Sequence, residues 1–235
     1  MTEKNLQFTS RLSRGETIAA LLYIPLHLWL LPGLLLYITE QGRRDIAQAN
    51  FLIYAIGLLY MLGLLWRFLR RDFDPLCDRP VYCLLEILKG YGLMYLGNLV
   101  IALLFTLLAV QTENINNAEI MDMGGSSWGK TVAMSVFMAP IVEECIFRAG
   151  IFGSLRRYSR WGAYAAAVLA FSLYHVAGYA LTDPSYWLFA LQYVPVSILL
   201  CRVYERCNSI WGCIFFHMLV NYIALNALKI LEGLL

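Results

Sequence analysis

Long apolar runs separated by short polar segments dominate the 235-residue chain. A transmembrane helix needs about 20 mainly apolar residues, and seven segments come close to or meet that requirement. We expect these helices at residues 18–38, 46–69, 91–110, 131–155, 161–181, 186–203 and 210–231. The pattern predicts an all-α, polytopic integral membrane protein with about seven transmembrane helices, and the chain shows no internal sequence repeat.

Turn-forming residues add detail to this pattern. Pro25 and Pro32 lie inside the first apolar run and are expected to kink it, because proline removes a helical hydrogen bond. Residues 111–130 form the one long polar segment, with Asn-rich and Gly-Gly-Ser-Ser stretches that favour turns. Asn208 or Ser209 is expected to cap the last helix at its N-terminus.

Composition supports the membrane interpretation. The chain is 60% hydrophobic and 14% charged, with a mean hydropathy of +0.62, whereas a soluble domain is about a quarter charged. The formal net charge of +2 and the lack of a dense basic stripe argue against a nucleic-acid partner. The six cysteines include no C-x-x-C pair, so we expect small buried side chains rather than disulfides or metal ligands.

Lysine and arginine placement predicts the orientation, because cytoplasmic loops are enriched in these residues. If the N-terminus is cytoplasmic, the inside segments hold twelve: Lys4, Arg11, Arg14, Arg67, Arg70, Arg71, Arg79, Arg156, Arg157, Arg160, Arg202 and Arg206. The outside segments then hold four: Arg43, Arg44, Lys130 and Lys229. We therefore expect Met1 inside and residues 111–130 outside.

Three charged residues interrupt the apolar run at residues 131–155. Glu143, Glu144 and Arg148 lie near its middle, and each charge at a bilayer centre costs roughly 2.5–3.5 kcal/mol. Residues four apart share one face of a helix, so Glu144 and Arg148 can pair. Glu143 lies about 100° away from Glu144 and is a candidate general base. The alternative is a structural Glu–Arg pair, which does not explain the second carboxylate.

Two of the three histidines lie in later predicted helices. His175 is in the segment at 161–181, and His217 shares a helix face with Asn221. Counted from the cytoplasmic helix ends at about 1.5 Å per residue, Glu143, His175 and His217 are roughly 18, 21 and 11 Å deep. These depths allow the three side chains to meet in one cavity. His27, in the first helix, has no acidic neighbour in the sequence and is assigned a packing role.

The ordered motifs E-E-x-x-x-R, F-x-x-x-H and H-x-x-x-N resemble the CPBP (Abi) family of intramembrane endopeptidases. The matching residues are Glu143-Glu144 with Arg148, Phe171 with His175, and His217 with Asn221. The family includes type 2 CAAX prenyl proteases and many bacterial proteins linked to bacteriocin processing or self-immunity. The resemblance implies a single transmembrane domain over residues 1–235, with N-terminal helices at 1–130 and the CPBP core at 131–235.

The resemblance also implies roles for the motif residues. Glu143 and His175 would activate water, while His217 and Asn221 would stabilise the oxyanion. Glu144 and Arg148 would shape the site and balance its charge. We favour a mechanism without a cofactor, since no H-E-x-x-H motif is present. If zinc is present, its ligands would be Glu143, His175 and His217.

The sequence leaves the substrate and two other function classes open. The expected partners are membrane lipid and a peptide or protein substrate, which could be membrane-embedded or prenylated. We expect the protein in the plasma membrane of a bacterium. Its peptidase function could be CAAX-type, bacteriocin-processing or related to self-immunity. A non-catalytic immunity or signalling scaffold is the main alternative. A proton-coupled transporter is disfavoured, because transporters commonly show inverted repeats.

Overall fold

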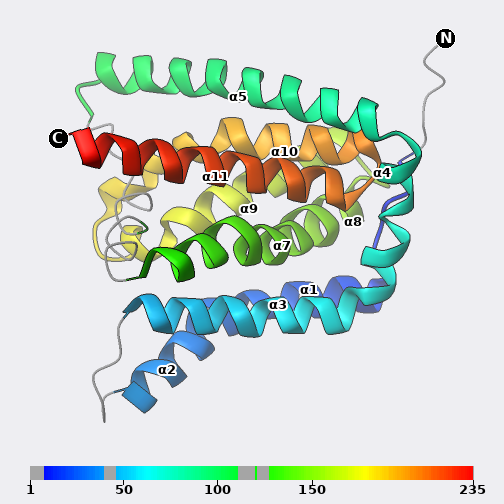
Figure 1. Ribbon diagram of the computed structural model, residues 1–235, viewed down its shortest axis with the longest axis horizontal. Helices are drawn as coiled ribbons and strands as arrows, with labels where there is room; N and C mark the ends of the chain where they lie inside the picture. The colour runs from blue at the N-terminus through cyan, green and yellow to red at the C-terminus, as the bar shows by residue number, and fades with distance from the viewer. Residues whose placement is uncertain (1–7, 40–45, 111–119, 121–126, 235) are drawn as a thin grey trace.

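A computed structural model of the protein describes residues 8–39, 46–110, 120 and 127–234. In this part of the chain the structure is helical and contains no strand. The helices pack as a bundle of roughly aligned rods (Figure 1). The all-α, polytopic membrane fold is therefore confirmed.

The α-helices are α1 (Arg14–Pro25), α2 (Leu31–Thr39), α3 (Ile46–Arg71), α4 (Asp74–Asp78), α5 (Pro80–Leu107), α7 (Ala139–Glu144), α8 (Gly153–Leu155), α9 (Arg160–Ala180), α10 (Val194–Cys207) and α11 (Ile210–Leu234). Three π-helical segments, Leu26–Leu30, Ala133–Met138 and Cys145–Phe152, and one 3₁₀ segment, Pro184–Tyr193, link some of them. The predicted loop at 111–130 lies outside the described residues except for position 120 and a helical start at 127–130.

Six helical segments among the described residues are long and apolar enough to cross a membrane. The predicted seventh, at 131–155, is helical throughout, but it carries Glu143, Glu144 and Arg148 near its centre. It is also the most enclosed segment, and Arg148 is the largest fully buried side chain among the described residues. The protein thus surrounds its charged helix with apolar ones.

Prolines explain where the helices widen or bend. Pro25 and Pro32 flank the π-helical segment Leu26–Leu30, and α2 runs at an angle to α1 (Figure 1). The kink expected in the first apolar run is present. Pro140 follows a second π-helical segment, in which the Ala139 N–H reaches back five residues to the Met134 carbonyl. A wider turn accommodates a residue that cannot donate a backbone hydrogen bond.

Two helices differ from the expected boundaries. Helix α5 begins at Pro80, well before the predicted residue 91, because the buried Glu86 carboxylate is paired with Arg202 at 2.9 Å and with Lys89 at 3.6 Å. A paired charge does not end a helix. The apolar run at 186–203 divides into a 3₁₀ segment and α10, with Pro195 in the first turn of α10, where proline is tolerated.

The end of the bundle that carries α4 is held by a buried polar cluster. The Ser10 hydroxyl lies 2.8 Å from both the Asp72 carboxylate and the Tyr204 hydroxyl, and Asp72 accepts the backbone N–H of Ile210. Ser209 caps α11, accepting the Trp211 N–H at 3.3 Å. These bonds tie the ends of α3 and α10 to the start of α11.

Candidate active site

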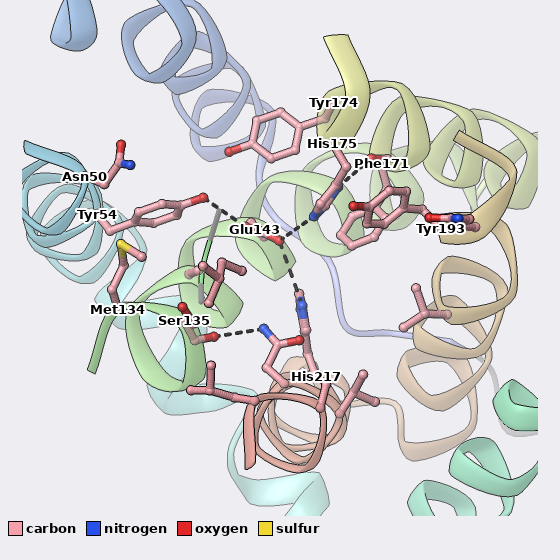
Figure 2. A pocket seen from close by; sticks show the side chains of 18 of the residues that line it. Asn50, Tyr54, Met134, Ser135, Glu143, Phe171, Tyr174, His175, Tyr193 and His217 are labelled. Atoms are coloured by element: carbon pink, nitrogen blue, oxygen red, sulfur yellow. Dashed lines mark hydrogen bonds and ion pairs between the residues drawn. The ribbon is translucent and has the colours of Figure 1, made fainter. Parts of the chain in front are cut away.

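The charged helix passes through the middle of the bundle, where α7 packs against α3 and α11. Glu143 is 4% exposed, and both Glu144 and Arg148 are fully buried. Figure 2 shows the side chains of Tyr54, His175 and His217 directed toward Glu143. All three charged groups therefore face protein rather than lipid.

Glu144 and Arg148 form the expected pair along their own helix, with Oε1 and Nη1 separated by 3.1 Å. Arg148 Nη2 also donates to the Ser197 hydroxyl at 3.0 Å, and its guanidinium lies 4.2 Å from the centroid of the Phe171 ring. Glu144 Oε1 additionally accepts from His217 Nδ1 at 2.8 Å. Glu144 thus pairs with the buried Arg148 and also holds His217 through a hydrogen bond.

The structure brings Glu143 together with both motif histidines, as their depths predicted. Glu143 Oε2 lies 3.7 Å from His175 Nε2 and 3.9 Å from His217 Nε2, and dashed lines mark both separations in Figure 2. These distances are too long for direct hydrogen bonds. The three atoms instead border a shared space.

Neighbouring groups set the tautomers of the two histidines. His175 Nδ1 lies 2.8 Å from the Phe171 carbonyl, and His217 Nδ1 bonds the Glu144 carboxylate. Both partners only accept, so each Nδ1 carries a proton, and each Nε2 presents a lone pair only when its ring is neutral. Glu143 Oε2 is also an acceptor, and it is buried without a hydrogen-bond partner in the described part of the chain. A water between these atoms could donate to Glu143 Oε2 and to His175 Nε2.

Asn221 lies near His217 but is already engaged. Its side-chain amide donates to the Ser135 carbonyl at 2.8 Å, which leaves the second N–H of the same nitrogen for another acceptor. His217 can donate from Nε2 only when that nitrogen is protonated. The oxyanion roles implied for these residues therefore depend on one remaining amide hydrogen and on a doubly protonated imidazole.

A cavity of about 620 Å³ contains the site. Glu143, His175, His217 and Asn221 line it, together with aromatic side chains that the sequence analysis did not select: Tyr54, Tyr91, Tyr95, Tyr174 and Tyr193. His27, assigned to packing, also lines the cavity. Tyr193 stacks on the His175 ring at a centroid distance of 4.4 Å. None of these residues belongs to a short motif, so only the fold identifies them.

Zinc is the metal that these ligand types suit best, since it takes carboxylate oxygen and imidazole nitrogen. Tetrahedral ligands at about 2.0–2.1 Å from zinc would lie roughly 3.3 Å apart, whereas Glu143 Oε2 stands 3.7 and 3.9 Å from the two imidazole nitrogens. No group of three or more metal-ligating side chains within the described ranges is arranged to hold an ion. The residues as placed do not fit zinc.

Comparison with known proteins agrees with the motifs. Residues 125–223 match the family model of Rce1-like type II CAAX prenyl endopeptidases. This stretch contains all seven motif residues that gave the resemblance, including Glu143, His175 and His217. Searches of curated proteins and of solved structures gave no match. The motif resemblance is thereby confirmed over residues 125–223, the part of the chain that matches this family of membrane proteases.

Proposed function

We propose that the protein is an intramembrane endopeptidase in which Glu143 is the general base for a water molecule. The observation that carries the proposal is the arrangement around Glu143 Oε2: a buried carboxylate oxygen without a partner faces two imidazole nitrogens at 3.7 and 3.9 Å. A water placed there can donate one proton to Glu143 and the other to His175 Nε2. Its lone pairs then point away, toward the cavity.

The proposed reaction conserves protons and charge. Water attacks the scissile carbonyl carbon as Glu143 Oε2 takes one of its protons. The carbonyl oxygen becomes an oxyanion, which accepts from Asn221 Nδ2 and from a protonated His217 Nε2. The C–N bond then breaks, and Glu143 returns the proton to the leaving amine. The products are a carboxylic acid and an amine.

Charge balance supports a protonated His217 during the reaction. Glu143 and Glu144 supply two negative charges, and Arg148 supplies one positive charge in the same buried cluster. A positive His217, hydrogen bonded to Glu144, brings the sum to zero. In a low-dielectric site an uncompensated charge is costly, so Glu144 is well placed to stabilise the imidazolium.

The family match favours a CAAX-type peptide as substrate, and a prenyl chain would enter from lipid. The test is to incubate purified protein in lipid vesicles with a quenched fluorescent peptide ending in a farnesylated Cys-a-a-X sequence. We expect cleavage of this peptide and slower cleavage of the same peptide without farnesyl. No cleavage of either by well-folded protein would contradict the proposal. Cleavage of a double-glycine leader peptide instead would favour bacteriocin processing.

Metal removal separates two mechanisms. If Glu143 and His175 alone activate water, a strong chelator should leave the rate of peptide cleavage unchanged. If Glu143, His175 and His217 hold zinc, the chelator should abolish cleavage and added zinc should restore it. The measurement is the cleavage rate after dialysis against chelator, with zinc content determined on the same sample. Loss of activity that only zinc reverses would contradict the metal-free mechanism.

The proposed location is a bacterial plasma membrane with the N-terminus cytoplasmic. Cys77 tests the orientation, because it is exposed on α4 while the other five cysteines are buried. An impermeant maleimide added to intact cells should leave Cys77 unmodified and should label it once the membrane is opened. A Cys77→Ser, Asp183→Cys variant probes the connection after α9 and should label in intact cells. The reverse pattern would contradict the orientation.

A further inference from the structure

Within the described residues, Tyr54 is the recorded hydrogen-bond donor to the Glu143 carboxylate. The hydroxyl of Tyr54 donates to Glu143 Oε1 at 3.3 Å, as the dashed line in Figure 2 shows. Tyr54 lies on α3, outside the residues 125–223 that match the family. The N-terminal half therefore contributes directly to the surroundings of the carboxylate.

Contacts on both sides hold Tyr54 in place. Its ring meets the His27 ring edge to face, with centroids 4.9 Å apart. The backbone is fixed one residue earlier, where the Tyr23 hydroxyl donates to the Ile53 carbonyl at 3.2 Å. Tyr23 reaches α3 closely because Gly57 has no side chain there; an added Cβ would collide with the Tyr23 hydroxyl. The hydroxyl of Tyr54 is thus presented to Glu143 by a rigid part of the fold.

The two oxygens of Glu143 have different surroundings. Oε1 accepts from Tyr54, whereas Oε2 faces the two Nε2 atoms without a direct hydrogen bond. The terminal torsion of a glutamate is broad and roughly two-fold, so nothing at Oε2 would by itself fix the plane of the carboxylate. The bond at Oε1 is the interaction that can fix it.

We propose that Tyr54 is a positioning residue that orients the Glu143 carboxylate, so that Oε2 rather than Oε1 takes the proton from water. This inference rests on the proposed role of Glu143 as general base. The bond persists through the reaction, because Oε1 still accepts from Tyr54 when Oε2 is protonated. The hydroxyl therefore restricts the carboxylate in both protonation states without exchanging a proton itself.

The test compares two Tyr→Phe variants on the same helix, each keeping the ring and removing one hydroxyl. Tyr54→Phe should lower kcat for the farnesylated Cys-a-a-X peptide by about 10–100-fold, the usual scale for a misplaced reacting group, with KM nearly unchanged. Tyr60→Phe is the matched control, since the Tyr60 hydroxyl donates to the Ala19 carbonyl at 3.0 Å and does not line the cavity. It should behave as the wild type in kcat and in KM.

A double variant distinguishes this inference from the proposed function. In a Glu143→Gln background, Tyr54→Phe should cause no further loss, because residues acting as one unit are not additive. If Glu143→Gln is inactive but Tyr54→Phe matches Tyr60→Phe, the positioning role is wrong and the general base stands. If Glu143→Gln is fully active, or the wild type cleaves no peptide, the proposed function is wrong and this inference with it. Thermal unfolding of each variant in detergent checks that all are folded.

Discussion

Replacing Glu143 with glutamine should abolish peptide cleavage while leaving the protein folded. Glutamine keeps the shape and volume of the side chain, and its amide oxygen can still accept from Tyr54. It cannot take a proton from water, and general-base catalysis is worth about 10²–10⁴-fold. We expect kcat to fall by at least that factor, with a thermal unfolding temperature close to that of the wild type.

Glu86→Gln is the matched control for this change. Glu86 is also 4% exposed, but it pairs with Arg202 and Lys89 and does not line the cavity. The same chemical substitution there should preserve kcat per folded molecule. The two variants together separate the loss of a buried carboxylate in general from the loss of the proposed base.

An active Glu143→Gln variant would contradict the proposed function. Full biological activity of Glu143→Gln in cells would mean that the carboxylate takes no proton during the activity. The protein would then act as a membrane scaffold that binds a hydrophobic peptide, and its cavity would be a binding site. Loss of cleavage with retained binding of the farnesylated peptide would instead support the hydrolase.

The membrane fold and the core of the site followed from local sequence patterns. Hydropathy alone located the apolar helices, because a span requires a long uninterrupted apolar run. Helix spacing paired Glu144 with Arg148, which the structure confirms at 3.1 Å. Counting residues from the helix ends placed Glu143, His175 and His217 at comparable depths, and they do converge.

Those patterns could not predict contacts between helices that lie far apart in the sequence. Tyr54 is separated from Glu143 by 89 positions, and no motif marks it. The bond between His217 Nδ1 and Glu144 also depends on how α11 packs against α7, which hydropathy does not encode. The early start of α5 required knowing that Arg202, on α10, would pair with Glu86. Each missed feature is a tertiary contact.

Glu144→Gln should destabilise the protein far more than the change at Glu143. Arg148 is fully buried, and Glu144 is its recorded counterion. Removing one partner of a buried ion pair typically costs about 3–5 kcal/mol, because the remaining charge is left uncompensated. The Ser197 hydroxyl and the Phe171 ring still contact the guanidinium, but neither carries a negative charge. We expect reduced expression and a clearly lower unfolding temperature in detergent.

Glu205→Gln provides the comparison at the edge of the bundle. Glu205 pairs with Arg156 and Arg160, whose side chains are 27% and 48% exposed. The Glu205 side chain is itself 10% exposed, but both arginines reach water and stay hydrated when the carboxylate is neutralised, so this variant should lose clearly less stability than Glu144→Gln. A Glu144→Gln, Arg148→Met double variant removes the unpaired charge and should regain part of the lost stability, without regaining activity. Equal stability of Glu144→Gln and Glu205→Gln would show that Arg148 does not depend on Glu144. Any loss of cleavage in Glu144→Gln would then result from the altered hydrogen bond between residue 144 and His217.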